Sequence, residues 1–130
     1  MRPLRKELNT ALARDFPNLY RAGPYVGPDV GDGWQLIVRR LSEKLESLIA
    51  ALPKNKRNQY CAIQIKEKYG GLRFYMSIAT EQMYDAIRAA EDESYRTCER
   101  CGEPGVLRGQ HWLFTACDVH SRGEAPTSST

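Results

Sequence analysis

The sequence has no apolar run of about eighteen residues, so no part of it is long enough to cross a membrane as a helix. It also has no apolar stretch behind the basic residues at positions 1–6, which argues against a secretory leader. From these two absences we expect a cytoplasmic protein without membrane contact. At 130 residues, 42% hydrophobic and 27% charged, the chain has the size and composition of one modest globular domain.

An excess of charge of one sign is also missing, because the formal net charge is only +3. The distribution of charge is more informative than the total. Six Lys and Arg residues stand against one Glu in residues 54–75, whereas six Asp and Glu residues stand against two Arg in residues 81–99. The sequence therefore predicts a bipolar surface, which suits a protein partner at least as well as a nucleic acid.

Motifs for catalysis are absent as well. There is no glycine-rich phosphate loop, no serine in a nucleophile-elbow context, and no His-x-Glu before a Pro-Cys-x-x-Cys. A His-Asn-His nuclease often carries cysteine pairs, but it also needs a histidine dyad and an asparagine, and His111 stands without them. We therefore expect a protein that is not an enzyme.

Cysteine is rare, with four residues, yet three of them stand in one pattern with a histidine. Cys98 and Cys101 are followed, after fifteen residues, by Cys117 and His120, which gives Cys-x2-Cys-x15-Cys-x2-His. Two close pairs of such ligands, one loop apart, can complete a tetrahedron around Zn²⁺. Because all four positions are protein ligands, no position is left for water, and the predicted zinc site is structural.

Two alternatives to zinc remain open. Disulfides or free thiols are one, but the three cysteines of the pattern cannot pair evenly without Cys61. A thioredoxin-like use of Cys98 and Cys101 is the other, and it needs a strand–helix setting that the preceding residues do not show. The second histidine, His111, lacks ligand spacing, and we interpret it as an ordinary loop side chain.

Apolar residues recur at helical spacing in three segments, which we predict as helices: 3–16, 34–52 and 81–97. Asp32 is predicted to cap the second helix and Thr80 the third. Four Gly and two Pro in residues 21–33 predict a loop. A loop of this length is often functional, and we expect Tyr25 to contact a partner; alternatively, Tyr25 and Val26 attach the loop to the core.

Alternating hydrophobicity in residues 60–69 and 71–79 predicts a β-hairpin with Gly70-Gly71 as its turn. This turn would place the apolar residues of both strands on one face by forming three pairs: Tyr69 with Leu72, Ile65 with Met76, and Ile63 with Ile78. The other face would carry a basic and aromatic set: Lys66, Lys68, Arg73 and Tyr75. Such a set can bind a partner or a nucleic-acid backbone, although a solvated sheet face is the simpler interpretation.

This order of segments predicts an α+β fold, in which two to three helices pack on a β-hairpin. A zinc-ribbon or treble-clef-like knuckle is predicted to follow it. We expect residues 1–97 to form a small α+β domain, residues 98–120 a zinc knuckle docked on it, and residues 121–130 a disordered tail.

Four spaced motifs carry a resemblance to a known family: Gly31-Asp32-Gly33-Trp34, Gln64–Tyr75, Thr97–Gly105 and Cys117–His120. Together they resemble a family of small phage and prophage proteins with a C-terminal Cys-x-x-Cys and Cys-x-x-His zinc knuckle, over about residues 15–120. The resemblance implies a bacterial or phage setting and a metal-binding knuckle, and it assigns no activity.

We therefore expect a non-enzymatic zinc-binding protein, in the cytoplasm of a bacterial host cell, that binds a bacterial protein or nucleoprotein complex. Small phage proteins without catalytic residues commonly act by binding a host assembly, so the expected role is inhibition of host defence, as in an anti-CRISPR protein. The alternative is a nucleic-acid-binding accessory protein that uses the same basic face. The expected partner-binding residues are Lys66, Lys68, Arg73, Tyr75 and Tyr25.

Overall fold

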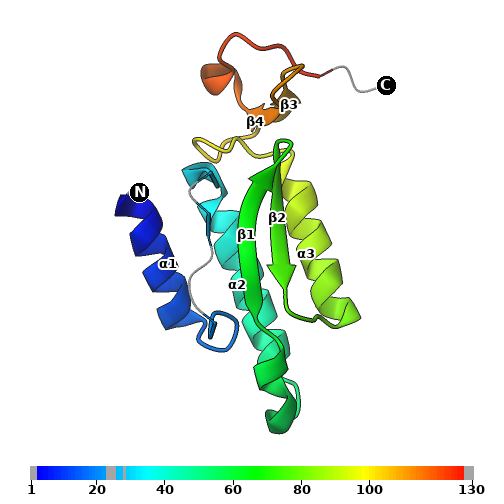
Figure 1. Cartoon of the computed structure of the whole chain (residues 1–130). Helices are drawn as coiled ribbons and strands as arrows, with labels where there is room; N and C mark the ends of the chain where they lie inside the picture. The colour runs from blue at the N-terminus through cyan, green and yellow to red at the C-terminus, as the bar shows by residue number, and fades with distance from the viewer. Residues whose placement is uncertain (1–2, 23–25, 28, 128–130) are drawn as a thin grey trace.

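The computed structural model describes residues 3–22, 26–27 and 29–127, and it confirms a small mixed α+β fold (Figure 1). The elements follow in this order: α1 (Pro3–Asp15), the 3-10 helix η1 (Asp32–Trp34), α2 (Gln35–Ala50), the 3-10 helix η2 (Lys54–Gln59), β1 (Ala62–Lys68), β2 (Gly71–Met76), α3 (Glu81–Ser94), β3 (Val106–Arg108), β4 (Phe114–Ala116) and the 3-10 helix η3 (Asp118–His120). None of the helices described here is long and apolar enough to span a membrane.

The core lies between the β1–β2 hairpin and the helices α2 and α3; in Figure 1, α2 stands behind the hairpin and α3 beside β2. The apolar stripe of α2 supplies much of this core, and Val38, Leu45 and Ile49 are fully buried. Each such side chain contributes roughly 1.5–3 kcal/mol when it leaves water. Helical periodicity therefore predicted the core-facing side of α2 correctly.

The predicted caps had different outcomes. The Thr80 side chain accepts a hydrogen bond from the Met83 amide at 3.2 Å, so the cap of α3 is confirmed. The prediction for Asp32 is wrong, because the cap position of α2 is Trp34 and no side chain caps it. The chain enters α2 through the 3-10 turn η1 instead, with the Trp34 amide bonded to the Gly31 carbonyl at 3.1 Å.

The hairpin turn lies one residue earlier than predicted. The strands pair Lys68 with Gly71 and Ile65 with Phe74, so Tyr69 and Gly70 form the two-residue turn. Both have positive φ, 55° and 82°, as a type I′ turn requires. The Glu67 carboxylate supports this turn by accepting a hydrogen bond from the Gly70 amide at 2.8 Å.

The predicted pairs Tyr69–Leu72, Ile65–Met76 and Ile63–Ile78 are consequently wrong, by two residues in register. A shift of two residues preserves which face each side chain occupies. The polar face predicted for β1 and β2 is therefore unchanged.

An irregularity between Ala62 and Gln64 corrects a second expectation. It leaves Ile63 45% exposed on the outer side, whereas Cys61 and Ala62 are buried. An extra residue in one strand changes the side from which the following side chains project, which simple alternation cannot foresee.

Side chains and loop backbone cover the edges of this two-stranded sheet. On β2, the Leu72 amide donates to Ser94 Oγ and the Phe74 amide donates to a Glu91 carboxylate oxygen, each at 2.9 Å. On β1, the Ile65 carbonyl accepts from the Gly27 amide at 2.8 Å. Val26, next to Gly27, is buried in the core, so the described part of the 21–33 loop is attached to the body, while Tyr25 lies outside the described residues.

The first prediction concerns the edge of β2. Ser94→Ala removes the acceptor of the buried Leu72 amide, and we expect the free energy of unfolding to fall by about 1–3 kcal/mol. Urea denaturation monitored by circular dichroism measures this change. Ser47→Ala, the same substitution at an exposed position of α2, serves as the control and should change stability little. Equal stabilities of the two variants would contradict the role of Ser94.

Candidate metal centre and the adjoining groove

The four predicted ligands come together at the end of the molecule where α3 leads out of the body. Cys98 lies four residues beyond the last residue of α3, Ser94, and Cys101 lies in the turn after Cys98, where Gly102 has a φ of 82°. The short antiparallel pair β3–β4 then returns the chain to Cys117, and η3 presents His120. We call residues 98–120 the knuckle, without assigning it to a named zinc-finger type.

The ligand atoms have the spacing of a tetrahedral metal site. All four lie within 4.8 Å of one another. The Sγ atoms of Cys101 and Cys117 are 3.7 Å apart, and His120 Nδ1 lies 3.6 Å from Cys98 Sγ and 3.2 Å from Cys117 Sγ. A tetrahedron with metal–sulfur bonds of about 2.3 Å and metal–nitrogen bonds of about 2.1 Å needs separations of about 3.8 Å and about 3.6 Å. The four residues therefore fit one metal ion.

The surroundings of Cys98 favour the thiolate that a metal needs. Burial alone raises the pKa of this thiol. Hydrogen bonds from the backbone amides of Cys117, Cys101 and Arg100 together outweigh this effect and lower the pKa to about 6. Three thiolates and an imidazole suit transition metals of borderline or soft character and do not suit Ca²⁺ or Mg²⁺. His111 is exposed and does not belong to this cluster.

Gly31, which precedes η1, and Gly33 and Trp34 within η1 hold the knuckle against the body. The Gly33 amide donates to the Glu99 carbonyl at 2.8 Å, and the Trp34 indole N–H donates to the Thr97 carbonyl at 2.9 Å. The backbones approach so closely that a Cβ at Gly33 would lie 2.1 Å from the Cys98 carbonyl oxygen, and one at Gly31 would lie 2.0 Å from that of Glu99. Only glycine fits at these two positions.

A second contact joins the knuckle to the hairpin turn. Thr115 Oγ1 donates to the Gly70 carbonyl at 2.7 Å. Leu107 packs against Gly70 so closely that a Cβ at Gly70 would lie 2.4 Å from Leu107 Cδ1. The knuckle is therefore attached at η1 and at the β1–β2 turn, which fixes its position on the body.

The segment after the knuckle differs from the predicted disordered tail. As far as Thr127 it runs beside β3, with the Thr127 amide bonded to the Leu107 carbonyl at 2.9 Å. Arg108, which is 5% exposed, crosses this layer and donates to the carbonyls of Ala116 and Glu124 and to the Asp118 carboxylate. Polar composition suggested disorder, but hydrogen bonds from Arg108 to Glu124, from Gly109 to Ala125 and from Thr127 to Leu107 hold residues 121–127 beside β3.

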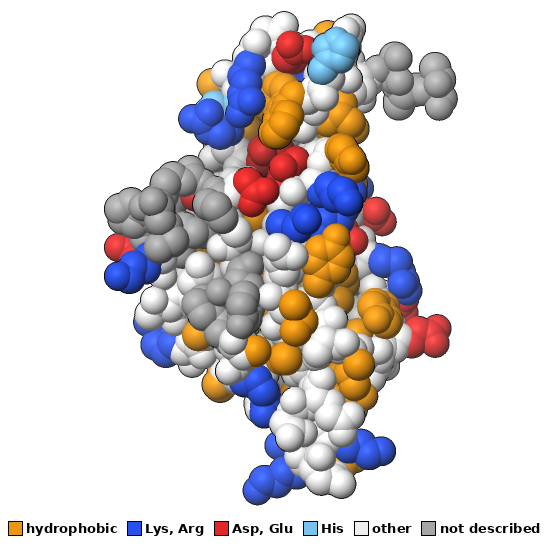
Figure 2. Space-filling model, in the orientation of Figure 1, with side chains coloured by type: hydrophobic (Ala, Val, Ile, Leu, Met, Phe, Trp, Pro, Cys, Tyr) orange, Lys and Arg blue, Asp and Glu red, His pale blue; other side chains and the backbone are white. Residues whose placement is uncertain are grey.

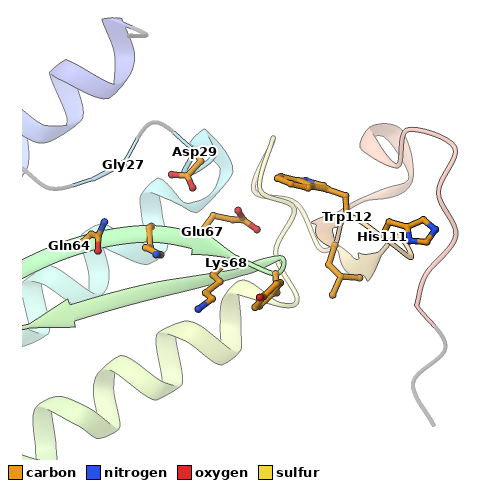
Figure 3. A pocket seen from close by; sticks show the side chains of 10 residues that line it. Gly27, Asp29, Gln64, Glu67, Lys68, His111 and Trp112 are labelled. Atoms are coloured by element: carbon orange, nitrogen blue, oxygen red, sulfur yellow. The ribbon is translucent and has the colours of Figure 1, made fainter.

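A hollow of about 560 Å³ lies between the knuckle and the hairpin, and we call it the knuckle groove (Figure 3). Its walls come from three places: Gly27 and Asp29 of the loop, the end of β1 with Tyr69, and residues 111–113 of the knuckle. Two of its aromatic rings are open to solvent, since Tyr69 is 66% and Trp112 is 71% exposed. Lys68 Nζ lies 5.5 Å from the centre of the Tyr69 ring.

The structure brings only some of the predicted partner-binding residues to this groove. Lys66 and Lys68 line it, while Arg73 and Tyr75 lie on the same face of the hairpin, opposite Lys66 and Gln64. Tyr25 lies outside the described residues, so its predicted role stays a prediction.

Sequence reasoning did not single out Trp112, which lines the knuckle groove. The available signal was a tryptophan beside a histidine in the loop between the two ligand pairs. A large aromatic side chain at such a loop tip has little core to enter.

Comparisons with protein families, with curated proteins and with solved structures found no match to this chain. The function proposed below therefore depends on the geometry of the metal centre, the groove and the hairpin face.

The second prediction concerns metal binding. We expect the purified protein to hold one metal ion per chain, and Cys101→Ser to lose it, because three ligands bind far more weakly than four. Elemental analysis of freshly purified protein measures the metal directly. Cys61→Ala is the control, since Cys61 is buried in the body away from the cluster and should leave the metal content unchanged. A metal-free wild-type protein would overturn the assignment.

The third prediction concerns the docking contact. Gly33→Ala forces a methyl group against the Cys98 carbonyl, and we expect it to destabilise the protein by about 3 kcal/mol or more. Thermal unfolding and metal retention under chelator challenge measure the effect. Gly123→Ala provides the control: nothing lies within 4 Å of its Cβ position, so only its φ of 75° costs energy, about 1–2 kcal/mol. Similar losses in both variants would count against the tight docking.

Proposed function

We propose that this protein is a non-enzymatic binding module whose knuckle is held by Zn²⁺ and whose partner is a bacterial protein or nucleoprotein complex. The observation that carries the proposal is the knuckle groove together with the open face of the hairpin beside it. Both surfaces are built by motifs that lie far apart in the sequence, and the metal centre holds one wall of the groove in place.

Zinc is the metal that suits this centre best. A Cys3His set in tetrahedral arrangement is a common structural zinc site, and the four protein ligands leave no position for a reacting water. Binding of zinc would stabilise the folded knuckle, since the ligands converge only when residues 98–120 are folded. The metal would therefore act on the shape of the molecule and not on a substrate.

The outer sheet face, made of Gln64, Lys66, Lys68, Arg73 and Tyr75, supports a role in binding. Figure 1 shows no described helix or strand in front of it, and Tyr75 is 42% exposed. Figure 2 shows Lys and Arg side chains beside hydrophobic ones over the hairpin. Exposed Ile63, at 45%, adds apolar area to the same side. Aromatic, aliphatic and arginine side chains in one patch are typical of interfaces.

The resemblance to small phage and prophage proteins supports a bacterial partner and a cytoplasmic site of action. A phage protein that binds without catalysis can act by occupying a surface that a host assembly needs. We therefore include inhibition of host defence, in the manner of an anti-CRISPR protein, in the proposal.

The second candidate is a nucleic-acid-binding accessory protein. The pairing of Lys66 with Arg73 across the strands, with Lys68 next along β1, places three cations on one face, and Tyr75 lies beside them. Phosphates would contact these cations, and affinity would then fall steeply with salt. This candidate uses the same surface without requiring a protein partner.

The fourth prediction tests the surface. Tagged protein is used to capture partners from bacterial lysate with and without nuclease, and the captured proteins are identified by mass spectrometry. We expect discrete protein partners that survive nuclease treatment. Their capture by Lys66→Glu/Lys68→Glu should fall by about tenfold or more, because the reversed charges no longer complement the surface of the partner. Lys54→Glu/Lys56→Glu makes the same change of charge on the exposed η2 and should leave capture unchanged.

Unchanged capture by Lys66→Glu/Lys68→Glu would contradict the assigned surface. Partners that all vanish with nuclease would instead favour the nucleic-acid candidate.

A further inference from the structure

The knuckle groove has two chemically different sides. On one side lie Lys66 and Lys68, continuous with the outer sheet face. On the other side lie Asp29 and Glu67, and Figure 3 shows both carboxylates and the Trp112 ring at the gap between the loop, β1 and the knuckle. Figure 2 shows a small patch of acidic side chains below the upper end of the molecule, beside basic ones. A ligand that fills the groove therefore needs an anionic part, a flat apolar part and hydrogen-bond donors.

An unpaired nucleotide has all three parts. Its phosphate is anionic and its base is flat. Cytosine, adenine and guanine also carry amino groups that can donate hydrogen bonds to carboxylates. Exposed aromatic rings beside cations are the usual means of holding single strands, because each base can stack on a ring while the backbone follows the positive charge. A duplex presents neither a free base face nor a free Watson–Crick edge.

We propose that the knuckle groove binds a single-stranded segment of DNA or RNA, with a base stacked on Trp112 and the phosphates at Lys66 and Lys68. Tyr69 offers a second ring at the same end of the hairpin, and the carboxylates of Asp29 and Glu67 meet the amino group of the base. This inference rests on the proposed binding function and deepens it, because it names the component of a nucleoprotein that the groove contacts.

The volume and the charges separate this ligand from its main competitor. About 560 Å³ is the size of a pocket for a small ligand, so it suits one or two nucleotides. An acidic peptide would satisfy Lys66 and Lys68, but it would meet repulsion from Asp29 and Glu67 and has no flat face to offer Trp112. A single strand satisfies both sides of the groove at once.

The protein contains its own reporter for the test. Of its two tryptophans, Trp34 is fully buried with its indole N–H bonded to the Thr97 carbonyl, whereas Trp112 is 71% exposed in the groove. Intrinsic fluorescence quenched by an added oligonucleotide therefore reports on Trp112.

The fifth prediction uses twelve-residue oligo(dC), oligo(dA) and oligo(dT), with the corresponding RNAs and a DNA duplex, added to the zinc-loaded protein of 130 residues. We expect saturable quenching by the single strands, an affinity that falls linearly with salt on logarithmic axes, and several-fold tighter binding of oligo(dC) and oligo(dA) than of oligo(dT). The preference arises because thymine has no amino group to donate a hydrogen bond to the carboxylates. Asp29→Asn should reduce it.

Three variants assign the binding to this site, with affinity followed by the anisotropy of labelled oligo(dC). Trp112→Leu should weaken binding about tenfold or more through lost stacking, and Lys66→Glu/Lys68→Glu should weaken it and lower the salt slope. Lys54→Glu/Lys56→Glu should bind like the wild type. Metal content and thermal unfolding confirm that each variant is folded, which is expected because Trp112 and Lys68 are exposed.

Several outcomes would overturn the inference. These are binding of the duplex as tight as that of single strands, an unchanged affinity in Trp112→Leu, or quenching by poly-glutamate equal to that by the oligonucleotides. If no oligonucleotide binds while a nuclease-resistant protein partner is captured in a way that depends on Lys66 and Lys68, the inference fails and the proposed function stands. If neither is seen, both fail.

Discussion

The close approach of two backbones at Gly31 and Gly33 is the constraint on which the rest of this structure depends. Without side chains at these positions, the Glu99 and Cys98 carbonyls come within the reach of a Cβ atom, and the Gly33 amide bonds to Glu99. This contact fixes the start of α2 relative to the first two metal ligands. A larger residue at either glycine would push the knuckle off the body, and the groove would lose one of its walls.

The metal centre and the groove are therefore parts of one device. Loop residues 111–113 lie between Cys101 and Cys117, so an ion bound by these ligands would also close the loop that carries Trp112. Thr115 ties the returning strand to the hairpin turn at Gly70. A domain of this size has a modest core, and the buried cluster at the knuckle consists only of Cys98, Phe114 and Ala116. A metal bound there would supply order where apolar burial is small.

Charge is divided between surfaces in a way that suits selective binding. The cations of β1 and β2 lie on the outer sheet face, while Glu91 of α3 is used inside the fold, where it accepts the Phe74 amide. Glu99 is half-buried and raised in pKa, first by burial, with the nearby Glu67 adding to the effect. The bipolar surface expected from the sequence has its basic part on the hairpin face, while Glu81, Asp85 and Asp92 are exposed on α3. Asp29 and Glu67 add a small acidic side at the groove, which restricts the ligands that fit.

The sequence by itself determined the parts that depend on local spacing. Two ligand pairs at Cys-x2-Cys and Cys-x2-His need only short turns to converge, helical periodicity identified the buried side of α2, and strand alternation placed Lys66, Lys68, Arg73 and Tyr75 on one face. Tertiary structure alone decided the hairpin register. Gly71 lies in β2 against the Tyr95 ring, where a Cβ would collide with it, and Tyr69 and Gly70 form the turn. Tertiary structure also decided that Ile63 is exposed, that residues 121–127 lie beside β3, and that Trp112 and β1 line one groove. Each of these depends on contacts between residues far apart in the chain, which no local pattern encodes.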